Sequence, residues 1–316
     1  MKSNFEFLQG KFPVLANFGG LAEQYCYSDS NSCLMKLGMI GETIVNLIFS
    51  YDGIPLPYDN TAVVRIDTLL REGLITRDLA DILHAIRKAR NRAVHQNYAS
   101  VEEGKTLLQM TYSLCEWFMQ TYGDWNYQNQ PFVMPEPTTV SKPTDTVADE
   151  SKEEELIKEA EEAAAASERI NPNARKKQAQ KAASQRVKSE AETRYMIDEQ
   201  LRKVGWEADT ENLRYSKGTR PVKGRCIAIA EWPTDSTVGN KGYADYALFV
   251  DLQMVATIEA KAIHKDIPSV IDYQCKDYSR NIRSEDESLL SLRVLGEILM
   301  SAGFFVAKNS EMLPIC

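Results

Sequence analysis

The sequence contains few residues of the kinds that cross-link a chain covalently or through metal. Six cysteines stand among 316 residues without a C-x-x-C pair, and the chain has three histidines. Zinc sites need closely spaced cysteine and histidine ligands, and disulfide frameworks are typical of short secreted chains. The sequence therefore argues against both and predicts buried, reduced thiols in a cytoplasmic protein.

Long apolar runs and an excess of positive charge are missing as well. No apolar run of transmembrane length stands out, and no basic, then apolar leader opens the chain, so we expect no membrane association. The net charge of −8 excludes nucleic-acid binding by overall charge. A hydrophobic content of 43% is enough for substantial cores, and the length suits about two domains.

Apolar spacing predicts a helical first domain over residues 1–130. Segments 34–49 and 78–95 repeat apolar residues at helical spacing, and Ser100 with Glu103 forms a capping box before a further helix. A Pro/Thr-rich stretch then leads into alanine-rich segments, the first acidic and the second basic. These segments predict a charged linker over 131–188, flexible or partly helical.

From residue 189 the pattern changes to helix, strands and helix. Residues 189–205 predict an amphipathic helix, residues 226–232, 243–250 and 254–262 predict strands, and 267–282 predicts a second helix. This order predicts a compact α/β core over 189–285, followed by a truncated or atypical tail over 286–316. The predicted fold class is α + α/β, a helical bundle and then a mixed sheet flanked by helices.

Three charged residues, Asp245, Glu259 and Lys261, interrupt two of the predicted strands. A hairpin with Val250 opposite Met254 places Asp245 opposite Glu259, and period-2 alternation puts Lys261 on the same face. Two neighbouring carboxylates repel unless a cation lies between them, and Mg²⁺ accepts such ligands while keeping waters for a phosphate. The pattern predicts a Mg²⁺ site for phosphodiester hydrolysis; the alternative is a surface ion pair with the lysine.

Two motifs then indicate a family. Asp245 followed by Glu259-Ala260-Lys261 resembles the D…E-x-K signature of the PD-(D/E)xK nucleases. Residues 274–278 match the Q-x-x-x-Y motif of the subset that includes the type I restriction enzymes. The phrases "IAIAEWPT", "GYADYALFV" and "EAETRYMID…GW" are similar to the N-terminal nuclease domain of the type I restriction subunit R.

This resemblance implies a role for each motif residue. The metal ligands would be Asp245, Glu259 and the carbonyl of Ala260. Lys261 would orient or deprotonate water. Further site residues would be Gln274, Tyr278 and a helix glutamate, Glu192 or alternatively Glu190.

The resemblance also implies an activity and its partners. We expect a type I site-specific deoxyribonuclease that cleaves double-stranded DNA in the restriction of foreign DNA, together with type I methyltransferase and specificity subunits. ATP would serve only motor domains, which this chain lacks. The loop-like "ASVEEGKT" at 99–106 follows no predicted strand, and its two glutamates would repel phosphate.

A basic segment supports DNA as the substrate. Between residues 212 and 230 there are five basic residues and no acidic ones. The predicted phosphate contacts are Arg214, Lys217, Arg220, Lys223 and Arg225. A solubilising surface loop is the alternative.

The helical domain carries a motif of its own, Arg90-Asn91-x-x-x-His95. It resembles the R-x-x-x-x-H signature of HEPN-like bundles, whose catalytic members cleave RNA without metal, with histidine as acid or base and arginine on the phosphate. A recognition or dimerisation module is the preferred interpretation here. Two alternative functions stay open: a metal-independent ribonuclease, and an inactive DNA-binding or interaction fragment without the ATPase motor.

Overall fold

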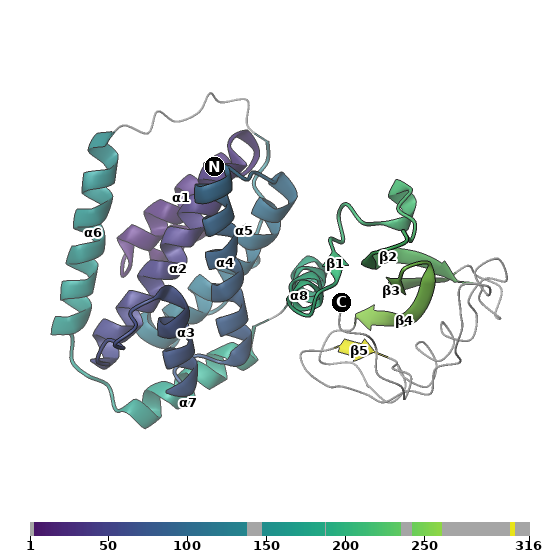
Figure 1. Cartoon of the computed structure of the whole chain (residues 1–316). Helices are drawn as coiled ribbons and strands as arrows, with labels where there is room; N and C mark the ends of the chain where they lie inside the picture. Colours follow the sequence, from purple (N-terminus) through teal and green to yellow (C-terminus); the bar gives the residue numbers. More distant parts are fainter. Residues whose placement is uncertain (1–2, 138–146, 187, 235–241, 261–303, 307–316) are drawn as a thin grey trace. The chain divides into compact units, whose positions relative to one another are not determined.

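The computed structural model describes residues 3–137, 147–186, 188–234, 242–260 and 304–306, without the side chains of 147–151, 259, 260 and 304–306. The chain divides into two compact units, Met1–Val187 and Lys188–Cys316. Unit 1 is helical, whereas unit 2 contains a sheet with a helix beside it (Figure 1). The predicted class α + α/β is confirmed.

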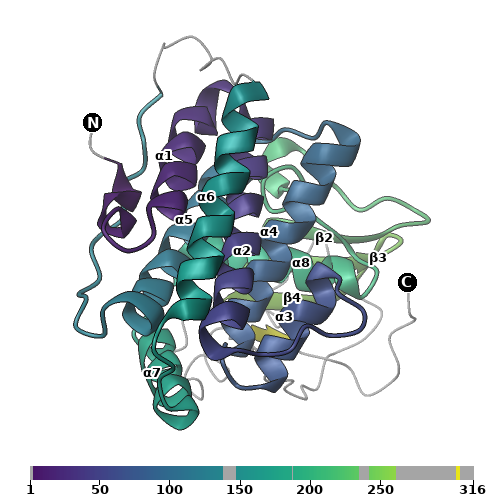
Figure 2. The same ribbon diagram turned by 90° about the vertical axis from the view of Figure 1, so that its left-hand side faces the viewer.

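Unit 1 is built around one central helix, α2, which contacts α1, α4, α5 and α6. Figure 2 shows α6 in front of the bundle. The predicted segments 34–49 and 78–95 lie within α2 and α4, so both helix predictions are confirmed. The elements are η1 (Asn4–Leu8), α1 (Pro13–Ser28), α2 (Ser30–Asp52), α3 (Ala62–Arg71), α4 (Arg77–Gln96), α5 (Val101–Phe118), the π-helical turn η2 (Met119–Gly123), α6 (Val147–Ala166) and α7 (Pro172–Ser184).

The apolar character of α2 comes from its place in the core. By length and composition alone, α2 is long and apolar enough to span a membrane, whereas the sequence was expected to contain no apolar run of that length. However, 67% of its apolar window is buried inside the protein. Leu34, Leu37, Ile40, Ile44 and Ile48 are each at most 1% exposed. Packing against the neighbouring helices therefore accounts for its composition.

The start of α5 confirms the predicted cap. The Ser100 side chain accepts a hydrogen bond of 3.2 Å from the backbone N–H of Glu103, and the helix begins at Val101. An N-cap oxygen satisfies one of the free N–H groups of the first turn. Residues 99–106 thus form a capped helix start after α4, where a phosphate loop would need a preceding strand.

Helices α6 and α7 occupy most of the segment predicted as a charged linker. Lys36 of α2 donates to Glu153 of α6 at 2.7 Å, and both side chains are about nine-tenths buried. On α7, the Ala179 carbonyl accepts a hydrogen bond of 3.0 Å from the indole N–H of Trp117. Both helices therefore pack against the bundle, although their sequences are strongly polar.

Arg175 makes the most buried of these contacts. Its side chain is 3% exposed, its Nε lies 3.6 Å from Asp52 Oδ1, and its guanidinium lies 4.3 Å from the ring centroid of Tyr122. It also donates to the carbonyl of Thr121. Burial raises the pKa of Asp52, although Tyr122 and Arg175 both act in the opposite direction. The ion pair is thus shielded from solvent, where removal of one partner is most destabilising.

The cysteine prediction holds for part of the chain. Cys26, Cys33 and Cys115 are buried free thiols.

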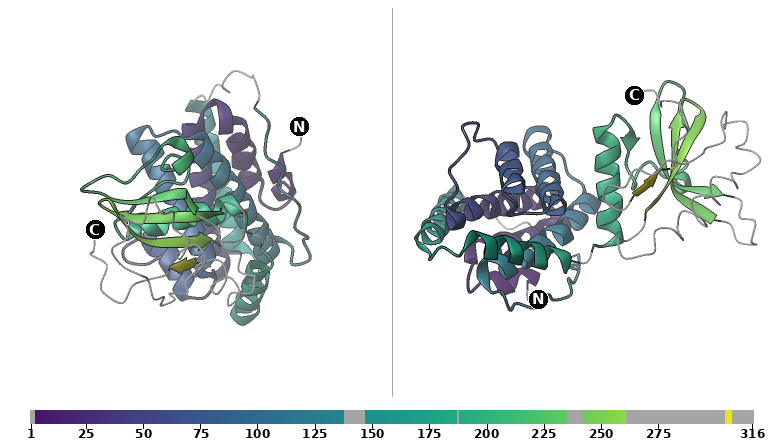
Figure 3. Two further views of the ribbon diagram at one scale, coloured as in Figure 1. Left: turned by 90° about the vertical axis from the view of Figure 1, so that its right-hand side faces the viewer. Right: turned by 90° about the horizontal axis from the view of Figure 1, so that it is seen from below.

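Unit 2 places a mixed sheet beside helix α8. Its described strands lie in the order β1-β2-β3-β4-β5, with β1 parallel to β2 and the other neighbours antiparallel. Figure 3 shows these strands side by side with α8 next to them. The elements are α8 (Glu190–Lys203), β1 (Glu207–Ala208), η3 (Tyr215–Lys217), β2 (Cys226–Thr234), β3 (Gly242–Val250), β4 (Gln253–Ala260) and β5 (Phe304–Val306).

Both faces of this sheet are covered by apolar side chains. Ile197 and Leu201 of α8 belong to a buried cluster with Tyr246 and Leu248 of β3. A second cluster contains Trp232, Ala247, Phe249 and Met254. Strands buried on both faces are expected to carry few charged residues, so those in β2 and β3 require a specific explanation.

The β3–β4 hairpin differs from its predicted turn and still keeps the predicted register. Val250 pairs with Gln253, so the predicted Val250–Met254 pair is wrong. A register shift between Leu248 and Phe249 then adds one residue to β4. Beyond this bulge, Tyr246 pairs with Ile258, and continuing that register by one position brings the backbone of Asp245 opposite that of Glu259. A two-residue turn and a bulge therefore compensate each other.

We expect Arg175→Met to lower the free energy of unfolding of unit 1 by about 3 kcal/mol, because it leaves the Asp52 carboxylate buried without its cation. Hydrogen exchange of α7 amides will measure the effect. Lys177→Met, at an exposed position of the same helix, is the matched control. Equal protection of α7 in the two variants would contradict the proposed anchoring role.

Candidate functional site

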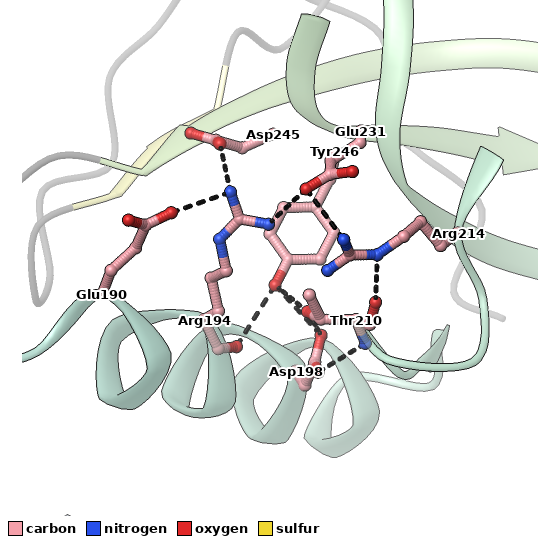
Figure 4. Close-up of polar contacts among 8 residues, drawn as sticks. All are labelled: Glu190, Arg194, Asp198, Thr210, Arg214, Glu231, Asp245 and Tyr246. Carbon is pink, nitrogen blue, oxygen red and sulfur yellow. Dashed lines mark hydrogen bonds and ion pairs between the residues drawn. The ribbon is translucent and has the colours of Figure 1, made fainter. Parts of the chain in front are cut away.

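A buried polar network joins α8 to β3. The Asp198 carboxylate of α8 accepts hydrogen bonds from the backbone N–H of Thr210 at 2.8 Å and from its hydroxyl at 2.9 Å. The Tyr246 hydroxyl lies 3.1 Å from the same carboxylate and donates to the Arg194 carbonyl at 3.2 Å. All of these groups are shown in Figure 4. The network fixes Tyr246, and with it the neighbouring Asp245, relative to the first turns of α8.

Burial changes the protonation properties of this network. It raises the pKa of Asp198, and the hydrogen bonds from Thr210 oppose this rise without cancelling it. Burial also raises the pKa of Tyr246, with the Asp198 charge adding to the effect. The tyrosine therefore remains a neutral hydrogen-bond donor at all physiological pH values.

Arg194 lies among three carboxylates that come from different elements (Figure 4). Its guanidinium is 3.0 Å from Glu190 of the same helix, 3.2 Å from Glu231 of β2 and 3.4 Å from Asp245 of β3. Burial is the largest influence on the Arg194 pKa and would lower it, but the three carboxylates together raise it. This region of unit 2 is therefore built to hold positive charge.

Glu231 reaches this cluster because β2 is distorted at that residue. Its φ of +52° is left-handed, a conformation that non-glycine residues rarely adopt within strands. Ala230 and Trp232, two positions apart, consequently belong to clusters on opposite faces of the sheet. Such bulge-like distortions redirect side chains next to functional sites. The Glu231 carboxylate also lies 3.0 Å from Arg214, which links the cluster to the basic segment.

The sequence-predicted metal ligands are described to different extents. The Asp245 side chain is 19% exposed, which leaves its carboxylate reachable by a small cation. Glu259 and Ala260 lie in β4, and their backbones pair with Phe305 and Phe304 of β5. Lys261, Gln274 and Tyr278 fall outside the described residues, as does the predicted helix 267–282. The roles assigned to these residues stay predictions.

The chemistry of the donors fits a hard cation. Oxygen ligands of the carboxylate type are those that Mg²⁺ prefers, and the carboxylates beside Asp245 already surround a positive guanidinium. Among the described side chains, no group of three histidine, cysteine, aspartate or glutamate residues has the arrangement of a complete metal site. The side chains of Glu259 and Ala260, the last two residues of β4, are not among those described.

The two candidate helix glutamates differ in their surroundings. Glu190 is 81% exposed and reaches Asp245 only through Arg194. Glu192 is 3% exposed, and its backbone N–H is capped by the Ser189 hydroxyl at 3.0 Å. Both lie in the first turn of α8, at the same end as Arg194. The choice between them stays open.

The basic segment separates into paired and available side chains. Arg214 is bound to Glu231, and Arg225 forms a two-pronged ion pair with Glu207. Arg220 is exposed and stacks on the Tyr215 ring at 3.8 Å. Lys217 and Lys223 are exposed, and no carboxylate partner is found for them among the described residues.

The histidine motif of unit 1 does not form a single site within the chain. Arg90 forms an ion pair of 2.5 Å with Glu42 of α2. Asn91 and His95 are exposed on α4. Arg90 and His95 are five positions apart, which on an α-helix is a rotation of about 140°. The two side chains therefore leave α4 in different directions.

Sequence reasoning missed Glu231 and Arg194. Glu231 carried a signal, because it is the one acidic residue in the apolar strand "CIAIAEWPT", just as Asp245 is in its own strand. Arg194 carried none, since a basic residue on an amphipathic helix is ordinarily a solvent-facing one. Its role emerges only from the approach of α8 to the sheet.

Comparison with known proteins relates unit 2 to a restriction enzyme. Residues 207–300 match the family described as the type I restriction enzyme EcoKI endonuclease subunit second domain. Residues 21–142 match a domain of unknown function, DUF4145, which gives no support for the HEPN-like prediction. The region matched by the restriction-enzyme family lies within unit 2.

One curated relative extends this similarity to most of the chain. The type I restriction enzyme EcoKI endonuclease subunit of Escherichia coli (strain K12) is 31% identical over 326 residues, covering 85% of this chain and 27% of the relative. The chain is thus similar to a type I restriction endonuclease subunit over most of its own length. It spans about a quarter of that relative's length. No solved structure matches the chain.

The raised pKa of Asp198 predicts a pH dependence for unit 2. A carboxyl whose folded-state pKa exceeds the unfolded value of 3.8 stabilises the fold fully below that value, and this contribution is lost as pH rises through the folded pKa. We expect Asp198→Asn to remove this loss, because the amide oxygen can still accept from Thr210. Hydrogen exchange of β3 amides from pH 4 upward measures it. The exposed Glu211→Gln variant is the control. If the stability of β3 in Asp198→Asn fell with pH as steeply as in wild type, the prediction would be contradicted.

Proposed function

We propose that this chain supplies the DNA-cleaving part of a type I restriction endonuclease, which hydrolyses phosphodiesters of double-stranded DNA with Mg²⁺ in the restriction of foreign DNA. The observation that carries the proposal is the register of β3 and β4, in which the backbones of Asp245 and Glu259 come opposite each other. Both residues lie within the region that matches the type I restriction family.

The proposed metal ligands are Asp245, Glu259 and the main-chain carbonyl of Ala260. A bound Mg²⁺ would supply an activated water and would neutralise charge on the phosphate. Lys261 is two positions beyond Glu259 and is assigned to orient or deprotonate that water. Gln274, Tyr278 and the helix glutamate are assigned to position the site.

Arg194 and Glu231 prepare the site in this proposal. Arg194 balances the negative charge near Asp245, which would otherwise raise the energy of three neighbouring carboxylates. One oxygen of Glu231, Oε1, contacts both Arg194 and Arg214 and holds these two arginines in place. The charge that remains for a metal is therefore set mainly by Asp245 and by residues of β4.

DNA binding is assigned to the available basic side chains Lys217, Arg220 and Lys223. Local positive charge allows an acidic protein to contact phosphates without a net positive charge. The proposed partners are DNA and the methyltransferase and specificity subunits of a type I complex. Another subunit of that complex would select the DNA target sequence. The chain spans 27% of the relative, and the proposal assigns it no ATP-driven translocation.

Loss of the metal ligand is expected to abolish cleavage and leave the fold intact. Asp245→Asn and Lys261→Ala, in the assembled restriction complex, should each reduce DNA cleavage by at least ~100-fold, because each removes a group that acts on the attacking water. Gel analysis of plasmid cleavage with Mg²⁺ or EDTA will measure this.

Glu211→Gln, an exposed change in unit 2, is the control. Wild-type cleavage by either site variant would contradict the assignment. Cleavage that resists EDTA would also contradict the role of metal.

The basic segment gives a separate prediction on DNA affinity. The double variant Lys217→Gln/Lys223→Gln should weaken binding to DNA of any sequence, and the slope of log affinity against log salt should decrease by about 2, or about 1 per lost phosphate contact. Arg225→Gln should change the slope much less, because Glu207 already pairs with that arginine. Fluorescence anisotropy with a DNA duplex measures both. An equal change of the salt slope in the double variant and in Arg225→Gln would contradict the distinction between available and paired basic side chains.

A further inference from the structure

Unit 1 contains a pocket that the proposed nuclease function does not use. It lies among α2, α3 and α4, three helices that are neighbours in Figure 1, and has a volume of about 280 Å³. Its lining includes the arginines 65, 87 and 90 and a single carboxylate, Glu42. The lining is thus positive by two charges, in a protein whose net charge is −8. A local excess of cations within a concave site attracts anions.

Arg65 is held in place without being neutralised. Its Nε donates to the Asn60 side-chain oxygen at 2.7 Å, and its Nη1 donates to the Asn46 side-chain oxygen. The Asn46 amide nitrogen donates in turn to Glu161 of α6 at 2.7 Å, which fixes the direction of the amide. Arg65 therefore binds two neutral oxygens, and no carboxylate pairs with it among the described residues.

Arg87 has a buried donor that nothing in the described structure satisfies. Its Nε is inaccessible to solvent and has no hydrogen-bond partner there. A buried donor without an acceptor is destabilising, and this guanidinium is neither neutralised by a carboxylate nor satisfied at Nε within the described residues. The charge also acts on a neighbour: burial lowers the pKa of His84, Asp67 opposes this, and Arg87 lowers it further.

The floor of the pocket depends on two glycines of α2. A Cβ at Gly38 would lie 2.5 Å from the Cγ and Cδ of Arg90, so only glycine lets that side chain cross α2. A Cβ at Gly41 would lie 3.3 Å from Ile86 Cγ2. Arg90 is thereby placed along the pocket and is fixed by Glu42. The close approach of α4 to α2 thus creates the site.

The remaining lining is apolar, with Val45, Ile66, Leu83 and Ile86. An apolar wall next to several guanidinium groups matches a ligand with a flat, weakly polar body and a phosphate end. Arginine presents planar pairs of N–H donors that fit phosphate oxygens. The volume is near the lower limit of ~300 Å³ for ligand pockets, which excludes a protein surface or a duplex and suits a single nucleotide.

We propose that this pocket binds a nucleoside phosphate, with the phosphate on Arg65, Arg87 and Arg90 and the base or sugar against the apolar wall. The site is independent of the nuclease centre in unit 2. His95 does not line the pocket. The ligand is therefore bound rather than cleaved by the Arg90–His95 motif.

Calorimetric titration of the full chain with ADP, GDP, CDP and UDP tests this proposal. We expect saturable binding of at least one nucleotide, at least ~10-fold tighter than binding of inorganic phosphate because the apolar wall also contributes. Arg87→Gln should weaken binding at least ~10-fold, because a charge-assisted bond to phosphate is lost. Arg65→Gln should act in the same direction and is the second variant if Arg87→Gln fails to fold.

Arg77→Gln is the matched control, because Arg77 begins the same helix, is 75% exposed and does not line the pocket. It should bind as wild type does. Absence of saturable binding for all four nucleotides up to millimolar concentration would overturn the proposal, as would equal affinity in Arg87→Gln and Arg77→Gln. Binding abolished by Asp245→Asn would also overturn it, since the nucleotide would then lie in unit 2.

Discussion

The pairing of β3 between β2 and β4 is the constraint on which the site in unit 2 depends. This one strand carries Asp245, aligns it with β4 through the register at Tyr246, and faces Glu231 of β2 on its other side. Because Tyr246 also binds the network of Asp198, the same strand is attached to α8. Movement of β3 by one residue would turn Asp245 away from Arg194 and break that network.

Charge balance is the second principle of this unit. Carboxylates from a helix and two strands meet at the partly buried guanidinium of Arg194, whose positive charge reduces their mutual repulsion. The left-handed backbone at Glu231 is part of the same arrangement, because it redirects a carboxylate that regular alternation would place elsewhere. Unit 1 shows the reverse situation, where guanidinium groups outnumber carboxylates around a pocket. An anion suits the pocket of unit 1, and a cation suits the carboxylates of unit 2.

Local patterns predicted much of this structure, and long-range contacts account for what was missed. Ser100 and Glu103 predicted a cap because the cap is formed within one turn. The polar helices α6 and α7 have no strong apolar side, yet contacts such as Arg175 with Asp52 bury them, and such partners lie far apart in sequence. Likewise the register near Asp245 was predicted from alternation, whereas the compensating turn and bulge were not. Arg194 carried no local signal at all.

The most direct test of the central claim, that Asp245 and β4 hold a divalent cation, is paramagnetic NMR of the full chain with Mn²⁺ in place of Mg²⁺. It needs neither motor domains nor partner subunits. The account predicts selective broadening of amide signals around Asp245, Tyr246 and the end of β4, reversed by excess Mg²⁺ and absent in Asp245→Asn. Broadening that is uniform over the surface, or that persists in Asp245→Asn, would contradict it.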